Sequence, residues 1–208
     1  MGNADNGHAA GVAGVKAAEA LALIGFGALS SNEKVGGVIF DDVGYNYYPA
    51  KQNSTSLFRM FNSIIDDEKS YQVKAENGLE NSLKTLYAKV KSNSVIIVIG
   101  DFNNFTDISK NYLKMLTKSN EVINIFCYDP IERDLPNAGV FTFSDGQQRF
   151  DIDCASKKQR QDYLNIFTDR QNGIKNFARQ YKMSYIELAT NDDLFKTINY
   201  GIMNNAAR

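Results

Sequence analysis

The sequence predicts an α/β protein with a doubly wound, mainly parallel sheet, helices on both faces and an extra β-hairpin. Short apolar runs such as VIIVIG (95–100) are typical of strands buried on both faces, and they alternate with segments of helical periodicity. Asp145-Gly146 joins two alternating runs and is the strongest hairpin signal. With 208 residues, of which 43% are hydrophobic, the chain is expected to form one globular domain.

The predicted elements follow from these patterns in chain order. Helices are expected at 15–29, from Ser54 or Thr55 onward, at 78–92, around 108–116, at 156–181 and after the acidic cap 191–193. Strands are expected at 35–41, 95–100, 121–128 and 183–190, with an aromatic extended piece at 45–48 that a break at Pro49 ends. Because the helix at 15–29 has little polar face, we expect protein to cover it on most sides.

Composition and charge exclude several classes of function. Lys+Arg of 23 against Asp+Glu of 24 give a formal charge of −1, which argues against a nucleic-acid platform. His8 is the only histidine, and neither a P-loop nor a complete dinucleotide fingerprint occurs. Cys127 and Cys154 have no C-x-x-C spacing, so we expect buried free thiols in a reducing compartment. The N-terminal segment has the pattern neither of a signal peptide nor of a membrane span, and a cytoplasmic location, with membrane association only through partners, is expected.

Polar residues at the ends of predicted parallel strands are the candidate site. Asp101, Asp129 and Thr190 each follow an apolar strand, where ligands bind in open parallel sheets. Asp101 has two interpretations, a turn or capping residue for the next segment, or an oxygen ligand for a hard cation such as Mg²⁺. Asp129 precedes Pro130, so a turn residue is favoured there, with the same cation role as the alternative.

Several stretches together carry a family resemblance. They are KVGGVIFDD after an Ala-rich helix, VIIVIGDF, VINIFCYDPIERDLPNAGVFTFSDG and SYIELATNDDLFKTI. The chain resembles, over most of residues 13–200, a bacterial von Willebrand factor A-like family catalogued as domain of unknown function fifty-eight. The resemblance implies a von Willebrand A-like fold in one domain, 1–208, that is N-terminally incomplete and lacks a central strand. Residues 1–12 are expected to be flexible.

The family resemblance also implies a metal-ion-dependent adhesion site built from three loops. Asp101 corresponds to its last acidic ligand, whereas the second-loop threonine is absent near Asn77 to Leu79 and the first motif has no counterpart. The site is therefore predicted to be degenerate, with no resident cofactor, and Mg²⁺ is the cation that it would take. The resemblance further implies a protein partner, such as a MoxR-type AAA+ ATPase, that meets loops around Asn77, Gly78, Asn103 and Asp129.

Two functional hypotheses follow. The first is a non-catalytic protein–protein interaction module, an adaptor or assembly factor. The alternative is a Mg²⁺-dependent phosphoryl- or nucleotide-processing enzyme that uses Asp101 and Asp129. The sequence offers that enzyme neither a phosphate cradle nor a recognisable basic residue beside the acids.

Overall fold

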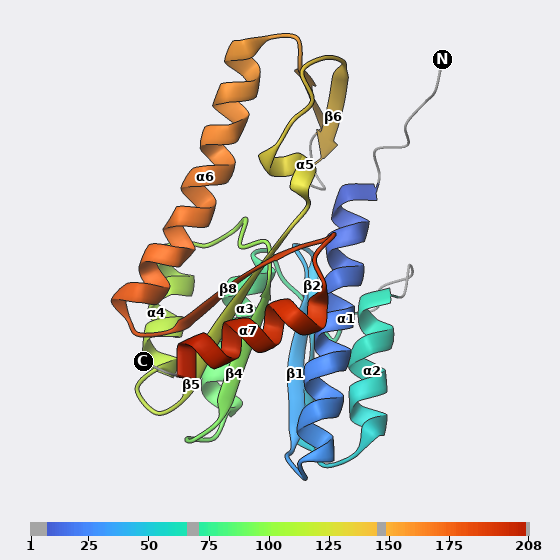
Figure 1. Ribbon diagram of the computed structural model, residues 1–208. Coiled ribbons are helices and arrows are strands. Elements are labelled where there is room, and N and C mark those ends of the chain that lie inside the picture. Colours follow the sequence, from blue (N-terminus) through green and yellow to red (C-terminus); the bar gives the residue numbers. More distant parts are fainter. Residues whose placement is uncertain (1–7, 66–70, 145–148, 207–208) are drawn as a thin grey trace.

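The computed structural model describes residues 8–65, 71–144 and 149–206, and its chain forms layers of helices around short sheets (Figure 1). The helices are α1 (His8–Ser30), α2 (Ser54–Ile65), α3 (Gly78–Lys89), α4 (Asp107–Leu116), α5 (Pro130–Arg133), α6 (Lys157–Gln180) and α7 (Leu194–Ala206). The strands are β1 (Val35–Phe40), β2 (Gly44–Lys51), β3 (Val73–Lys74), β4 (Val95–Gly100), β5 (Glu121–Tyr128), β6 (Val140–Ser144), β7 (Arg149–Asp153) and β8 (Ser184–Ala189). The predicted α/β class is confirmed.

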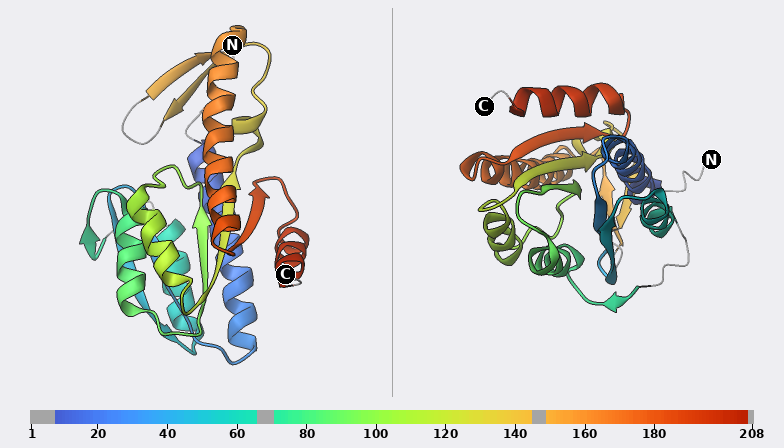
Figure 2. Two further views of the ribbon diagram at one scale, coloured as in Figure 1. Left: turned by 90° about the vertical axis from the view of Figure 1, so that its left-hand side faces the viewer. Right: turned by 90° about the horizontal axis from the view of Figure 1, so that it is seen from below.

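The parallel sheet is formed by β4, β5 and β8, in the order β4-β5-β8. Alternate residues of β5 point to opposite faces of this sheet, as strand geometry requires. Ile123, Ile125 and Cys127 pack with α1 and α7, whereas Val122 and Phe126 pack with α3, α4 and α6. Helices therefore cover both faces of the parallel sheet, as Figure 2 shows in two further views.

A separate antiparallel sheet, in the order β1-β2-β3, differs from the sequence prediction in two ways. The aromatic segment after β1 does not lead directly to a helix but folds back onto β1 as β2. Asp41 makes the turn, because its side chain accepts hydrogen bonds from the backbone N–H groups of Val43 and Gly44. The predicted break at Pro49 is wrong, since Pro49 lies inside β2, at an irregularity of the ladder opposite Gly36 that tolerates a missing N–H donor.

The hairpin β6–β7 and the amino end of α6 stand apart from the two sheets (Figures 1 and 2). The antiparallel pairing of β6 with β7 confirms the predicted hairpin, although Asp145-Gly146 lies outside the described residues. The long helix, the last parallel strand and the final helix lie within a few residues of their predicted bounds.

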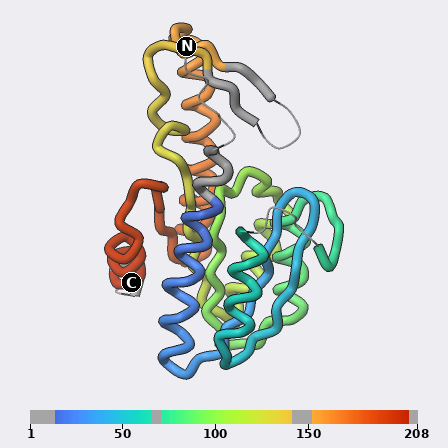
Figure 3. Tube along the Cα trace, turned by 90° about the vertical axis from the view of Figure 1, so that its right-hand side faces the viewer, coloured from blue at the N-terminus to red at the C-terminus, as the bar shows by residue number. Residues whose placement is uncertain are grey.

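Helix α1 begins earlier than predicted and is less covered than its composition suggests. It starts at His8, so residues 8–12, expected to be flexible, are helical, in keeping with the high helix propensity of their alanines. Residues 1–7 lie outside the described part. Ala18 and Ala20 are buried, but Val15 and Phe26 are 55% and 44% exposed. In Figure 3, α1 and α2 run side by side along one side of the molecule, and the two helices are in contact. None of the described helices has the length and apolar character needed to cross a membrane.

Candidate functional site at the carboxyl edge of the parallel sheet

The carboxyl ends of the three parallel strands bring the predicted site residues to one side of the sheet. Asp101 follows β4, Asp129 follows β5 and Thr190 follows β8. We call this side, defined by these three residues, the carboxyl edge. The Thr190 hydroxyl donates a hydrogen bond of 3.3 Å to Oδ2 of Asp129, and the Thr190 N–H donates to the Tyr128 carbonyl. The ends of β5 and β8 are thus joined directly.

Asp101 is exposed, and Asn103 engages its carboxylate. Oδ1 accepts a hydrogen bond of 3.1 Å from the backbone N–H of Asn103, and Oδ2 accepts one of 2.6 Å from the Asn103 side-chain amide. The turn interpretation of Asp101 is therefore confirmed, because the carboxylate closes a local turn onto a residue two positions ahead. Asn103, predicted as part of a partner-binding loop, lies beside Asp101.

The turn after Asp101 places a bulky residue in an unfavourable backbone conformation. Phe102 has a φ of 53°, in the left-handed region, and only 3% of its surface is exposed. Its ring packs in an edge-to-face contact with Phe105 at 5.8 Å and stacks on Phe126 at 6.5 Å. A left-handed conformation costs a non-glycine residue roughly 1–2 kcal/mol, so this aromatic packing holds the turn in place.

Asp129 caps the short helix α5. Its Oδ1 accepts a hydrogen bond of 2.9 Å from the Ile131 N–H, and the Asp129 N–H donates one of 3.0 Å to Oε1 of Glu132. This reciprocal arrangement is a capping box, with Pro130 at the first helical position. The turn interpretation of Asp129 is confirmed, and Glu132, which the sequence analysis did not single out, is its partner.

Arg170 of α6 connects the ends of β4 and β5. Its guanidinium donates to Oδ1 of Asn103 and forms an ion pair of 2.6 Å with Oε2 of Glu132. The two charged side chains are largely buried, with 16% and 19% exposure. The guanidinium also lies over the rings of Phe126 and Phe167, at 5.6 and 5.5 Å from their centroids.

We call the chain of contacts Asp101–Asn103–Arg170–Glu132–Asp129 the Arg170 bridge. It corrects the expectation that no basic residue lies beside the acids. No local sequence pattern marks Arg170, because its partners are 67 and 38 residues away along the chain. The carboxylates of Asp101 and Asp129 are linked through the bridge and not through a shared ligand position. Among the described residues, no cluster of three or more His, Cys, Asp or Glu side chains could hold a metal ion.

Asn77 and Gly78 lie at the amino end of α3. Asn77 has a left-handed backbone, φ 58°, and its side chain does not cap the helix. Gly78 is required by close packing, because a Cβ there would lie 1.7 Å from the carbonyl oxygen of Asp41. Nearby, the Thr106 hydroxyl, which caps α4, donates a hydrogen bond of 3.0 Å to Glu80. These contacts join the α3 loop to the segment after β4, but not to the Arg170 bridge.

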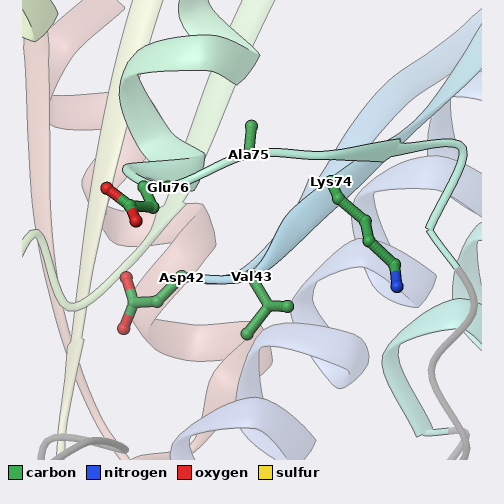
Figure 4. A pocket seen from close by; sticks show the side chains of 5 residues that line it. All are labelled: Asp42, Val43, Lys74, Ala75 and Glu76. Atoms are coloured by element: carbon green, nitrogen blue, oxygen red, sulfur yellow. The ribbon is translucent and has the colours of Figure 1, made fainter.

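A cavity of about 380 Å³ adjoins these loops and is lined by Asp42, Val43, Lys74, Ala75 and Glu76. Figure 4 shows the carboxylates of Asp42 and Glu76 on the same side of this cavity, with Lys74 extending away from them. Asp42 accepts a hydrogen bond of 2.8 Å from the side chain of Asn104, which ties the end of β1 to the loop after β4. No local pattern in the sequence predicts this acidic side of the cavity.

Both cysteines are free and buried, as predicted. Cys127 lies on β5, two positions before Asp129 in the chain. Burial, with a smaller contribution from the negative charge of Asp101, raises the pKa of the Cys127 thiol to about 12. A thiol with so high a pKa stays protonated near neutral pH, which makes it a poor nucleophile. Cys127 therefore serves the core and not the chemistry of the carboxyl edge.

Comparisons with known proteins identify a family match and one distant structure. The family described as "Protein of unknown function DUF58" matches residues 7–173, which is most of the chain. A crystal structure described as an uncharacterized membrane spanning protein from Vibrio fischeri is 12% identical, covering 90% of this chain and 84% of that one, with a TM-score of 0.24. No curated protein shows a match.

Proposed function

The chain belongs to the DUF58 family, and from this membership and the contacts at the carboxyl edge we propose that it is a non-catalytic protein–protein interaction module. In this proposal the carboxyl edge is the contact surface, and it is a degenerate form of the adhesion site of von Willebrand A-like domains. The partner is a protein of the MoxR-type AAA+ class, as the resemblance implies. The protein acts on this partner as an adaptor or assembly factor.

The Arg170 bridge is the observation that carries the proposal. In an adhesion site, a metal ion supplies positive charge at the strand ends and holds the acidic loops in place. Here the side chain of Arg170 supplies a positive charge at the same end of the sheet. Both carboxylate oxygens of Asp101 already accept hydrogen bonds from Asn103, so a cation would have to displace an existing contact to use them.

The donor set therefore does not fit Mg²⁺ well. This ion demands near-octahedral oxygen ligands at about 2.0–2.1 Å. Asp101 offers one carboxylate within a closed turn, and a guanidinium lies one side chain away. No step of the proposed function runs through a metal ion.

Support for a recognition role also comes from the backbone. Phe102, two positions after the carboxyl end of β4, adopts a left-handed conformation that is uncommon for an aromatic residue. Unfavourable backbone geometry that surrounding packing maintains is concentrated at functional sites in proteins. Exposed Asp101 lies directly before Phe102, so the packed turn fixes the position of a charge that a partner can reach.

The test measures binding to a purified MoxR-type AAA+ ATPase of the same organism, immobilised for interferometry. Asp101→Asn keeps an oxygen for the turn but removes the charge, and we expect it to weaken binding at least tenfold with an unchanged circular dichroism spectrum. Asp107→Asn is the matched control, because Asp107 is an exposed acid in the first turn of α4, outside the bridge. We expect that variant to bind like the unmodified protein.

No measurable binding of the unmodified protein, or equal binding by the Asp101→Asn variant, would overturn this proposal. The degenerate character of the site is tested separately. A calorimetric titration of the protein with MgCl₂ should give no saturable heat up to millimolar concentrations. Saturable binding of Mg²⁺ that Asp101→Asn abolishes would show a working cation site.

A further inference from the structure

A second cavity, of about 310 Å³, lies between α5 and the amino end of α6. Figures 1 and 2 show α5 beside the amino half of α6, close to the hairpin β6–β7. Clefts that hold small molecules have volumes of about 300–1,000 Å³, so this cavity is at the lower end of that range. We call it the α5–α6 cavity, and its lining includes Arg133, Leu135, Lys157, Arg160, Tyr163 and Leu164.

Positive charge predominates in the lining of the α5–α6 cavity. Arg133 belongs to α5, whereas Lys157 and Arg160 lie three positions apart on α6 and therefore on one face of that helix. Asp134 is the one acid among the described lining residues, and its Oδ2 lies 3.0 Å from Nε of Arg133 in an ion pair. Three cations and one acid give the lining a net charge of +2.

The two basic side chains of α6 have no acidic partner. Lys157 is exposed, and neither Lys157 nor Arg160 forms an ion pair in the part of the chain that the structure describes. The Arg160 guanidinium donates to the Cys154 carbonyl, which carries no net charge. A guanidinium has five N–H donors, so this contact leaves donors of Arg160 for a ligand.

The same positive charge lowers the stability of α6 when the cavity is empty. The first turn of this helix contains Lys157, Lys158 and Arg160 and no acid. Ser156 caps the helix through its hydroxyl, which accepts a hydrogen bond of 3.4 Å from the Gln159 N–H, but the cap adds no negative charge. Cations at the amino end of a helix are unfavourable, and a bound anion there is favourable. An anion in the cavity would therefore offset this repulsion.

The other lining residues can accommodate the organic part of a ligand. Leu135 and Leu164 are both half-buried and offer apolar contact. Burial, with a smaller contribution from the negative charge of Glu132, raises the pKa of the Tyr163 phenol. Because this phenol stays protonated near neutral pH, it adds no negative charge to the cavity.

We propose that the α5–α6 cavity binds a small organic molecule that carries a phosphate monoester. Guanidinium groups donate pairs of parallel N–H bonds to phosphate oxygens, and an ammonium group adds a point charge. A phosphate monoester carries a charge of about −1.5 to −2 at pH 7, which matches the net charge of the lining. A carboxylate would leave one positive charge uncompensated. The organic part of the molecule lies against Leu135 and Leu164.

The size of the cavity favours a small molecule over a phosphorylated protein. A volume of about 310 Å³ exceeds what a phosphate group alone fills, but it leaves little room for the backbone of a peptide that carries the group. This site goes beyond the proposed function, because it needs neither Asp101 nor a protein partner. Arg133 directly follows Glu132 of the Arg170 bridge, so the two sites share α5, but neither proposal depends on the other.

The first test is a calorimetric titration of the full chain with phenyl phosphate at pH 7.5 and low salt. We expect one saturable site. Phenyl sulfate is the matched control ligand, because it has the same ring and a tetrahedral group with only one negative charge, and we expect it to bind about tenfold more weakly. No saturable heat with phenyl phosphate, or equal affinity for the two ligands, would overturn the proposal.

Two further ligands separate the possible sources of a phosphate group. Inorganic phosphate lacks the organic part, and the peptide Gly-Ser-phosphotyrosine-Ser-Gly adds a backbone that does not fit the cavity. Both should bind more weakly than phenyl phosphate. Equal or tighter binding of inorganic phosphate would reduce the site to one for a free anion. Tighter binding of the peptide would assign the cavity to a phosphorylated protein. Either result would overturn the proposal.

Substitutions in the protein test the location of the site. Lys157→Gln and Arg160→Gln should each lower the affinity for phenyl phosphate about tenfold, because each removes a charged donor. Arg179→Gln is the matched control, since Arg179 lies in the last turn of the same helix, and this variant should bind like the unmodified protein. Unchanged affinity in both cavity variants, or an equal loss in the control, would refute the location.

Melting temperatures show whether Lys157 acts through the ligand. Lys157 forms no ion pair in the described ranges, so its replacement should leave the fold intact. Lys157→Gln removes a cation from the first turn of α6 and should raise the melting temperature of the free protein by about 1–2 °C. Saturating phenyl phosphate should raise the melting temperature of the unmodified protein more than that of the variant. Equal ligand-induced shifts would refute the role of Lys157.

Discussion

The substitution Arg170→Met should lower the stability of the protein without unfolding it. Methionine retains the apolar stem over Phe126 and Phe167 but removes the guanidinium that contacts Asn103 and Glu132. Glu132 then keeps a largely buried carboxylate, 19% exposed, with no cation beside it in the Arg170 bridge. Removing one partner of a buried ion pair is more costly than the net value of the pair, because the remaining charge stays desolvated.

The magnitude follows from the contacts that are lost. A hydrogen bond to a charged group contributes about 1.5–3 kcal/mol, and a cation–π contact about 0.5–1 kcal/mol. The hydrogen bond to Glu132 and the two cation–π contacts together give about 2.5–5 kcal/mol, and the contact with the exposed Asn103 adds little. Because both side chains of the ion pair retain some exposure to water, the lower part of this range applies. We expect the free energy of unfolding to fall by about 3 kcal/mol, which a domain with a typical stability of about 5–15 kcal/mol survives.

Urea unfolding followed by far-ultraviolet circular dichroism measures this change. Arg179→Met is the matched control, since Arg179 lies on the same helix, is exposed and, among the described residues, donates only to Asn176. We expect this control substitution to cost about 0.5 kcal/mol or less. Glu132→Gln retains the capping box. In a double-mutant cycle with Arg170→Met it should give a coupling energy of about 1–2 kcal/mol. A loss for Arg170→Met no greater than that for Arg179→Met, or zero coupling, would refute the bridge as a structural element.

Two further predictions concern the cap of α4 and the buried thiols. Thr106→Ala should lower the free energy of unfolding by about 1 kcal/mol, because the Ser109 N–H loses its acceptor. Thr106→Ser keeps a hydroxyl acceptor and should retain most of the wild-type stability. Equal losses of stability in the two variants would refute the capping role. Native Cys127 and Cys154 should resist iodoacetamide at pH 8 and react only in urea. Because the folded pKa of Cys127 is raised to about 12 from 9.0, its contribution to stability is present below pH 9 and lost as the pH rises toward 12. Rapid labelling of Cys127 in the folded protein at pH 8 would contradict its burial.

The parallel sheet could be predicted from the sequence because its strands are buried on both faces. A continuous run such as VIIVIG has few alternatives to a buried strand at that length, and helices of matching length flank it. The antiparallel pairing of β1 with β2 does not follow from the strand pattern alone, although Asp41 and Gly44 carry the chemistry of a tight turn. Pro49 resembles a strand break in the sequence because its place inside β2 depends on a ladder irregularity opposite Gly36, which the sequence does not reveal.

The candidate site shows a different limit of sequence interpretation. The turn roles of Asp101 and Asp129 depend on bonds to residues two positions ahead, so local chemistry suffices to predict them. Arg170 depends on contacts across the fold, and it is one of many basic residues on a helix whose polar face is mostly solvent-exposed. Nothing in the local sequence distinguishes it from Arg179.

The short loop after β4 takes part in two groups of contacts. Asn103 accepts a hydrogen bond from Arg170 within the Arg170 bridge, and the adjacent Asn104 donates one to Asp42 at the end of β1. Both asparagines follow the turn that Phe102 holds in a left-handed conformation. Recognition at the carboxyl edge should depend on the charge of Asp101 and not on the Asn104–Asp42 contact. Asp101→Asn should therefore weaken partner binding, whereas Asp42→Ala should not, and equal losses from the two substitutions would refute the assignment of recognition to Asp101.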